Sequence, residues 1–140
     1  MQRGHLLPVP LVMTPMSQPL AYLLVCLGGS LGAASRYFLA SAIHPTRFPL
    51  ATFLINITGC FAIGLITTFL SGKAPTTDAL RLFLVVGFLG AYTTFSTFGL
   101  ENHKLLSGGS WEIAAAYISA SVFLGVLAVK WGVLCGKVFT

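Results

Sequence analysis

The residues best suited to chemistry lie together in the stretch GFLGAYTTFSTFGLE, from Gly87 to Glu101. Its glycines and β-branched threonines hold a helix poorly, although the surrounding sequence is apolar. A helix that breaks here leaves backbone carbonyl and amide groups without partners, which a membrane tolerates only inside protein or beside a polar cavity. Transporters use freed carbonyls of this kind to bind hard cations. The stretch therefore predicts an ion site on an interrupted helix, against the alternative of an ordinary helix with small packing residues.

Two phenylalanines in this stretch share a helical face, because Phe95 and Phe98 are three residues apart. Aromatic residues at this spacing usually pack in a core, but the edge of a phenyl ring carries partial positive charge. Phenylalanines that line a path can therefore favour an anion. Glu101 follows one turn later, near the expected mouth, where it is either solvated or ends a polar track.

Three other positions place polar groups inside apolar segments. Asn56 needs partners for two donors and an acceptor, and on residue type alone we favour a hydrogen bond between helices over a role in transport. Tyr117, Ser121 and Gly125 lie four apart on one helical face, although hydroxyl groups often bond to their own helix. Arg36 is the only residue charged at neutral pH well inside a predicted span. It marks either function or a long side chain that reaches the lipid head groups.

The sequence offers little support for catalysis. No pair of nucleophile and base, no metal-binding triad and no phosphate-binding loop is evident, so we do not expect an enzyme. Cys26, Cys60 and Cys135 lie in apolar stretches without a CxxC pair, and we interpret them as buried free thiols. The eight Lys and Arg residues are scattered through loops and ends, which argues against a nucleic-acid partner.

Membrane helices must position these residues. Of the 140 residues, 56% are hydrophobic and only 8% are charged, roughly a third of the charged fraction of a soluble domain. At about 20 residues per crossing, the chain allows four transmembrane helices, and we predict an all-α integral membrane protein. The predicted helices cover about 20–43, 49–70, 79–106 and 111–138, separated by the polar stretches HPTR, SGKAPTTD and SGG.

The N-terminal segment differs from the rest of the chain. Residues 1–19 contain four prolines, which prevent the continuous apolar core of a signal peptide. We expect a disordered extension here, followed by a single helical domain over residues 20–140. Met13 and Met16 are alternatives to Met1 as the start of translation, since the membrane pattern begins only after them.

The basic residues give little orientation signal. Four crossings place both termini on one side, and the loop and end charges to be compared are Arg3, Lys73, Arg81 and Lys137 against Arg47 and Lys104. The positive-inside rule uses such differences to set orientation, and this difference is small. A chain with so little bias can insert both ways. Two copies in opposite orientations could enclose a pore, which four short helices rarely enclose alone.

Three motifs together resemble the Fluc, or CrcB, family of bacterial fluoride channels: GGSLGAASRY at Gly28–Tyr37, NITG at Asn56–Gly59, and GFLGAYTTFSTFGLE. The resemblance covers about Leu20 to the C-terminus. It implies a dual-topology homodimer of antiparallel four-helix subunits in the cell (inner) membrane, with a third helix broken at its centre. It also implies two fluoride pores and passive efflux of cytoplasmic fluoride, and so fluoride resistance.

The resemblance also implies roles for individual residues. Backbone carbonyls matching Gly90 and Thr93, from both subunits, would hold one structural sodium ion that is not transported. The positions that match pore residues are Asn56, Phe95, Phe98, Tyr117 and Ser121. The positions that match the polar track toward the vestibule are Thr94, Ser96 and Glu101. Gly125 stands where some relatives have a second serine, so that end of the fluoride path can differ.

The physics of fluoride fits this assignment, because a pore must replace the strong hydration of this small anion with donors such as amides and hydroxyls. Two alternatives remain. A small dual-topology, proton-coupled multidrug exporter needs a carboxylate deep in its first helix, where this chain has Arg36 and no acid. A non-conducting membrane subunit predicts no ion flux and no strong effect of Phe95→Ile or Phe98→Ile.

Overall fold

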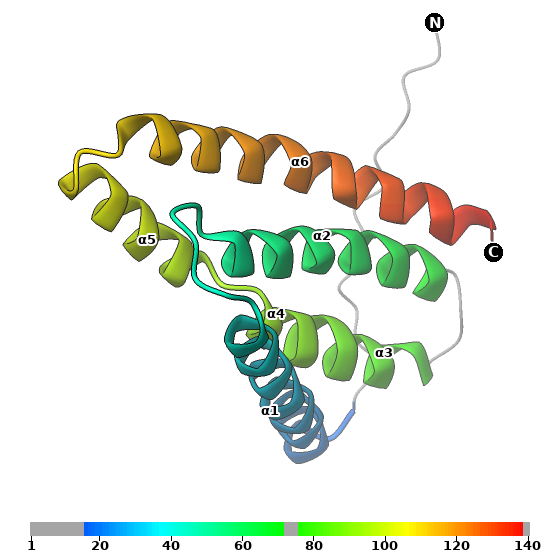
Figure 1. Ribbon diagram of the computed structural model, residues 1–140. Helices are drawn as coiled ribbons and strands as arrows, with labels where there is room; N and C mark the ends of the chain where they lie inside the picture. The colour runs from blue at the N-terminus through cyan, green and yellow to red at the C-terminus, as the bar shows by residue number, and fades with distance from the viewer. Residues whose placement is uncertain (1–15, 72–75, 139–140) are drawn as a thin grey trace, which may run out of the picture.

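The computed structural model describes residues 16–71 and 76–138. These residues form helices and no strand (Figure 1). Four segments are long and apolar enough to cross a membrane: Gln18–Ala42, Leu50–Leu70, Asp78–Ser107 and Trp111–Val138. The prediction of an all-helical chain with four spans is confirmed. Most of the predicted extension, residues 1–15 with Met13, lies outside the described residues.

The first two spans are single helices. Helix α1 (Gln18–Ala42) begins two residues before the predicted start, with a proline in its first turn, where the missing N–H is not needed. It ends where Ile43 becomes extended and donates its N–H to the carbonyl of Leu39 at 3.3 Å. Helix α2 (Leu50–Leu70) begins directly after Pro49.

The third span is composed of several segments. A short helix α3 (Thr76–Leu80) continues into a π-helix, η1 (Arg81–Leu89), and then into one turn of α-helix, α4 (Gly90–Tyr92). Helix α5 (Phe95–Ser107) completes the span. Between α4 and α5, Thr93 (φ −80°, ψ 156°) and Thr94 (φ −150°, ψ 116°) are extended, and we call these two residues the α4–α5 junction.

A tight turn joins α5 to the last helix, α6 (Trp111–Val138). Ser110 donates its N–H to the carbonyl of Leu105 at 2.8 Å, and Gly109 donates to Leu106 at 3.1 Å. This pair of bonds defines a Schellman motif, which needs a left-handed residue at the position of Gly109. Gly109 has φ +75°. The predicted stop at SGG therefore has a backbone cause.

Helices α2 and α6 lie side by side along most of their length (Figure 1). Their backbones meet at glycines: a methyl group on Gly64 would collide with the carbonyl of Val129, and one on Gly132 with the carbonyl of Phe61. We call this contact the α2–α6 seam. Close approach through small residues is typical of membrane helices, which gain their association energy from van der Waals packing.

Glycines also allow close contact between α1 and η1. A methyl group on Gly28 would collide with the carbonyl of Phe83, and one on Gly32 with the carbonyl of Phe88. Gly28 and Gly32, four residues apart, form a small-xxx-small pair that admits another helix of the same chain.

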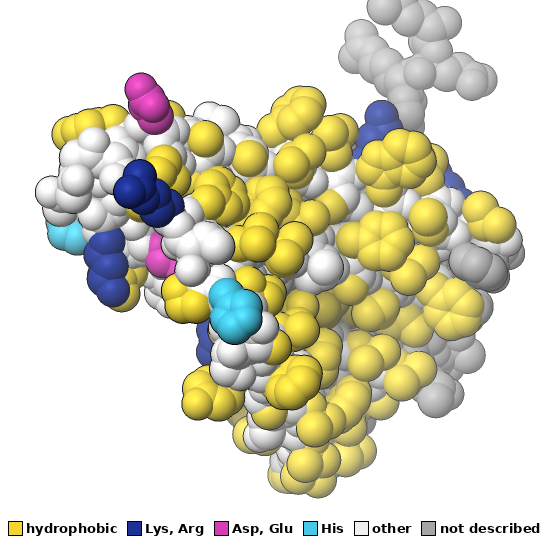
Figure 2. Space-filling model, viewed as in Figure 1, with side chains coloured by type: hydrophobic (Ala, Val, Ile, Leu, Met, Phe, Trp, Pro, Cys, Tyr) yellow, Lys and Arg dark blue, Asp and Glu magenta, His cyan; other side chains and the backbone are white. Residues whose placement is uncertain are grey.

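Much apolar surface faces outward from this single chain. The buried hydrophobic cluster is small, with Ile55, Leu89 and Tyr92 at its centre. By contrast, the side chains of Phe95 and Tyr37 are 83% and 77% exposed, and hydrophobic side chains cover most of the face shown in Figure 2. Surface of this kind must be covered by lipid or by another chain.

Candidate functional site

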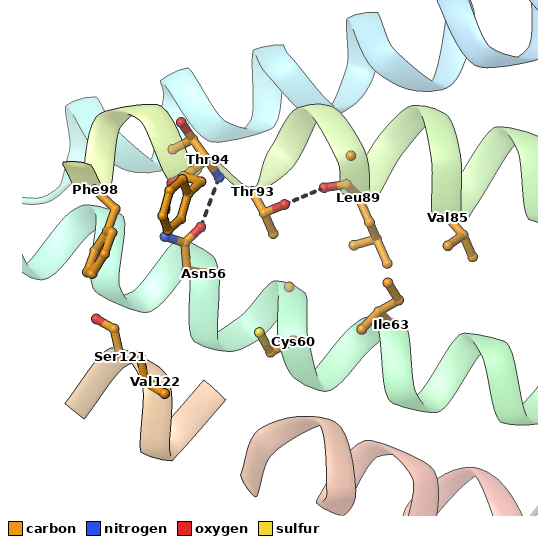
Figure 3. A pocket seen from close by; sticks show the side chains of 13 residues that line it. Asn56, Cys60, Ile63, Val85, Leu89, Thr93, Thr94, Phe98, Ser121 and Val122 are labelled. Atoms are coloured by element: carbon orange, nitrogen blue, oxygen red, sulfur yellow. Dashed lines mark hydrogen bonds between the residues drawn. The ribbon is translucent and has the colours of Figure 1, made fainter. Parts of the chain in front are cut away.

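Asn56 is bonded to the α4–α5 junction through both ends of its amide. Its Oδ1 accepts the backbone N–H of Thr94 at 2.9 Å, and its Nδ2 donates to the carbonyl of Thr94 at 3.2 Å. Figure 3 shows Asn56 on α2, facing Thr94. Buried backbone groups must find partners, and this side chain supplies both partners for the residue that leaves the helix.

The junction redirects two N–H groups that an uninterrupted helix would give to its own carbonyls. The N–H of Thr94, which would normally bond to Gly90, bonds to Asn56 instead. The N–H of Thr97, which would normally bond to Thr93, bonds at 3.3 Å to Oγ1 of Thr94, the N-cap of α5. The carbonyls of Gly90 and Thr93 therefore lose their ordinary helical donors.

Thr93 is fixed from two sides. Its backbone N–H and its Oγ1 both donate to the carbonyl of Leu89, at 3.0 and 2.9 Å. Its methyl group lies where a side chain on Gly59 of α2 would stand. The glycine thus allows the junction to approach α2 closely enough for Asn56 to reach it.

A cavity of 370 Å³ opens beside the junction, and we call it the central cavity. It lies between α2, the third span and α6 (Figure 3). The structure brings together in its lining most of the residues that the sequence singled out: Asn56, Gly90, Thr93, Thr94, Phe95, Phe98 and Ser121.

Ser121 contributes an unpartnered hydroxyl to this cavity. Its Oγ exposes less than 1 Å² and has no hydrogen-bond partner among the described residues. A hydroxyl in a helix usually bonds back to its own backbone, and this one does not. A buried hydroxyl without a partner is costly, and that of Ser121 is therefore available to a group that enters the cavity.

The two phenylalanines lie together but in different surroundings. The ring centroids of Phe95 and Phe98 are 5.7 Å apart with an interplanar angle of 36°. Phe98 also makes an edge contact with the ring of Tyr117, at 4.9 Å and 61°. Phe95 remains 83% exposed. The ring of Phe98 packs against another ring of the chain, and the ring of Phe95 lies largely at the surface of the chain.

Glu101 forms a second polar cluster, one turn beyond Phe98. Its Oε1 accepts the hydroxyl of Thr52 and its Oε2 accepts the hydroxyl of Tyr117, both at 2.8 Å. Tyr117 is fully buried, with its ring also against Phe48 at 5.3 Å. Both carboxylate oxygens are therefore fixed by donors from α2 and α6. A second cavity, of 510 Å³, lies at this end and is lined by Thr52, Glu101 and Lys104, among others.

The remaining candidates lie outside the two cavities. Ser96 is exposed, and its Oγ lies 3.3 Å from that of Thr94. Arg36 is half-buried and lines neither cavity. The interpretation of all three cysteines as buried thiols is wrong for Cys26, which is exposed, and Cys60 and Cys135 are only half-buried. All three are free.

Sequence reasoning missed two residues of these clusters. Thr52 bonds to Glu101, and its position one turn before Asn56 on the same face was the available signal. Thr97 bonds to Thr94 through both its backbone N–H and its hydroxyl. For Thr97, the corresponding signal was its position three residues after Thr94, the N-cap of α5.

Four apolar spans around cavities that contain amide, hydroxyl and phenyl groups define a small multi-pass membrane protein. The family described as CrcB-like protein, Camphor Resistance (CrcB), matches residues 23–133. The chain therefore belongs to the CrcB family.

The match to this chain covers nearly the whole length of several named relatives. A protein of Acidobacterium capsulatum named "Fluoride-specific ion channel FluC" is 46% identical over 119 residues, or 83% of this chain and 95% of that one. Proteins of the same name from Solibacter usitatus and Chlorobium phaeobacteroides are 44% and 42% identical, over 83% and 89% of this chain and 98% of each relative.

Proposed function

We propose that the chain is a fluoride-selective channel of the bacterial inner membrane, through which cytoplasmic fluoride leaves passively. Fluoride that enters as HF from acid surroundings is trapped inside as the anion, which supplies the outward gradient. A channel moves its ion without chemical change, so the chain is not an enzyme. The observation that carries the proposal is an unpartnered, buried hydroxyl and an amide that line the same cavity. The chain that holds them is 42–46% identical to proteins named as fluoride-specific channels.

The donors of the central cavity suit a small, strongly hydrated anion. An asparagine amide carries two N–H groups, and the bond to Thr94 uses one of the two on Asn56. The hydroxyl of Ser121 is free to donate. The phenyl rings of Phe95 and Phe98 can turn their positive edges toward the anion. Together these groups can replace part of the hydration shell that fluoride gives up.

The path continues toward the second cavity through the polar track. In this track, Oγ1 of Thr94 lies 3.3 Å from Oγ of Ser96 and 3.1 Å from Oγ1 of Thr97. Beyond Phe98, the hydroxyls of Thr52 and Tyr117 both point at Glu101. Because hydroxyls rotate, the same groups can donate to an anion that passes.

A structural sodium ion fits the carbonyls of Gly90 and Thr93. Support comes from the diverted donors: the N–H groups that would occupy these carbonyls are bonded to Asn56 and to Thr94 Oγ1. Backbone carbonyls are ligands that hard cations accept. The ion would offset the cost of bringing anions to the middle of the membrane, and it would not be transported.

We also propose that two copies assemble as an antiparallel homodimer. Two carbonyls from one chain are few ligands for a hard cation, and two copies together supply four, so a site shared between copies is better satisfied. The 83% exposure of Phe95, a residue of the central cavity, supports a pore completed by a second subunit. The small charge bias of the sequence supports insertion in both orientations.

The test is flux through purified protein in liposomes loaded with potassium fluoride and followed with a fluoride electrode. Release begins when a potassium ionophore allows charge balance. We expect fast release of fluoride, and release of chloride slower by several orders of magnitude. No fluoride release, or equal rates for the two anions, contradicts the proposal.

The sodium site is tested separately by replacing Na⁺ on both sides with N-methylglucamine. Loss of fluoride release on removal and its return on adding Na⁺ support the site. Unchanged release without Na⁺ speaks against the assignment of Gly90 and Thr93, while the channel function itself stands.

A further inference from the structure

The central cavity contains a polar group to which no role has been given, the thiol of Cys60. Asn56 and Cys60 are one turn apart on α2, and Ser121 and Gly125 are one turn apart on α6. Asn56, Cys60 and Ser121 line the cavity. Figure 3 shows the sulfur of Cys60 on the wall formed by α2, one turn from Asn56. The first level of the wall has an amide and a hydroxyl, and the second has the thiol of Cys60. Gly125 is buried on α6 beside this second level and does not itself line the cavity.

The thiol lies against the position that Gly125 leaves empty. A β-carbon added to Gly125 would lie 3.5 Å from the sulfur of Cys60 and 4.0 Å from Cδ1 of Ile57. These are ordinary van der Waals distances, so a small side chain would fit there. Because Gly125 provides no donor at this level, Cys60 is the side chain that can provide one.

The thiol is also uncommitted. Cys60 is free of any disulfide, and among the described residues no hydrogen bond occupies it. The neighbouring hydroxyl of Ser121 is buried and unpartnered as well. Two adjacent donors without acceptors, in a cavity of 370 Å³, indicate a ligand that accepts hydrogen bonds.

The other two cysteines provide an internal contrast. Cys26 is exposed on α1, and Cys135 is half-buried on α6, and neither lines the central cavity. Any property that depends on the cavity should therefore belong to Cys60 alone.

We propose that Cys60 is a further residue of the fluoride path, whose S–H group donates to the anion at the level where Gly125 has no hydroxyl. The proposal rests on the function proposed above. An S–H group is a weaker donor than O–H, so this level of the path holds the anion less firmly than the level of Ser121. A thiol also binds soft metal ions, which amide and hydroxyl groups do not. The path therefore acquires a specific sensitivity to mercury.

The first experiment uses HgCl₂, a small neutral reagent, on the full chain in liposomes. The thiol S–H bond breaks, an S–Hg bond forms, and H⁺ and Cl⁻ are released. We expect HgCl₂ to slow fluoride release at least tenfold in the unmodified protein and in the matched controls Cys26→Ser and Cys135→Ser, but not in Cys60→Ser. Block that persists in Cys60→Ser, or that Cys26→Ser removes, overturns the proposal.

The second experiment measures the donor itself. Loss of one hydrogen bond of about 1 kcal/mol corresponds to about a fivefold change, so Cys60→Ala should lower fluoride flux about fivefold. Cys60→Ser, which puts a stronger donor at the same position, should conduct faster than Cys60→Ala. Gly125→Ser, added to Cys60→Ala, should restore flux, since the added hydroxyl fits beside position 60. Equal flux in Cys60→Ala and the unmodified protein contradicts a donor role.

A third measurement separates this proposal from the channel function. Intact-mass analysis of the detergent-purified protein counts mercury atoms per chain before and after Cys60→Ser. One fewer mercury in the variant shows that the reagent reaches the cavity wall, even in a preparation that releases no fluoride. A preparation that conducts fluoride while Cys60 stays unmodified rejects Cys60 as part of the path.

Discussion

The α2–α6 seam and the α4–α5 junction both bring backbone segments into close contact in the interior of the membrane-spanning part, but by different means. At the seam, Gly64 and Gly132 remove side chains so that two intact helices touch. At the junction, the backbone leaves the helix, and the amide of Asn56 replaces the lost hydrogen bonds. The first contact depends on shape alone, and the second on hydrogen bonds.

This difference indicates that the seam holds the helices together, whereas the junction is part of the candidate site. Among the described residues, the buried side-chain atoms without a hydrogen-bond partner belong to Asn102 and Ser121, and neither residue is part of the seam's glycine contacts. The junction diverts two N–H groups from the carbonyls of Gly90 and Thr93, which leaves polar atoms available beside the central cavity. Substitutions at the seam should therefore change stability and leave selectivity unaltered, whereas substitutions at the junction should change both.

The largest effect is expected for Asn56→Leu, which removes both partners of the Thr94 backbone. Two buried backbone groups left unpaired cost about 2–6 kcal/mol together, and fluoride release should be lost. Thermal unfolding in detergent and the liposome assay measure the two effects. Thr67→Val is the matched control on the same helix, because that hydroxyl bonds only to its own helix. An Asn56→Leu protein that unfolds at the original temperature would remove the distinction between junction and seam.

Next in size is Tyr117→Phe, which leaves Oε2 of Glu101 without its donor but keeps the ring against Phe98. A hydrogen bond to a charged group is worth about 1.5–3 kcal/mol, and fluoride flux should fall with it. Tyr37→Phe, at a site 77% exposed, is the control. Equal stability and flux in both variants would show that Glu101 does not depend on this bond.

At the seam, Gly132→Ala forces the backbone of α6 away from the carbonyl of Phe61. Overpacking of this kind costs about 1–3 kcal/mol, and the ratio of fluoride to chloride flux should not change. At Gly99, an added methyl would meet no atom within 4 Å apart from its neighbours in the same helix, so Gly99→Ala should leave the stability of the chain unaltered. A Gly132→Ala protein with altered anion selectivity would mean that the seam is part of the site.

The smallest effect is expected for Thr94→Val, which removes the N-cap hydroxyl of α5 but retains the backbone bonds to Asn56. Loss of an N-cap costs about 1 kcal/mol. Thermal unfolding should shift correspondingly less than in Asn56→Leu. If Thr94→Val lowers the unfolding temperature more than Asn56→Leu does, the side chain of Thr94 stabilises the junction more than its backbone bonds to Asn56.

The spans could be predicted because long apolar segments and polar stops are local features. The last helix occupies the predicted range, Trp111–Val138, and the stop at SGG follows from the conformational freedom of Gly109. The π-helical winding of Arg81–Leu89 was not predicted, because hydrogen bonding to the fifth residue has no residue pattern of its own.

The site could be predicted only as a set of residue types. The composition of the stretch from Gly87 to Glu101 indicated unpaired backbone groups, but not which side chain would meet them. Asn56 and Thr94 are 38 residues apart, and Thr52 and Glu101 are 49 apart. Such pairings depend on how whole helices are placed, so residue type alone favoured a plain interhelical bond for Asn56.

The bond between Asn56 and Thr94 also constrains how the protein is made. The ribosome completes Asn56 38 residues before Thr94, and chains assemble from the N-terminal end during synthesis. The α4–α5 junction exposes backbone groups that lipid cannot solvate, so a third span released into the bilayer before α2 would meet a barrier. The order of the helices along the chain ensures that the amide is already in the membrane when the segment that needs it arrives. A circularly permuted chain with α2 at its C-terminal end should therefore insert poorly, even though its final contacts are the same.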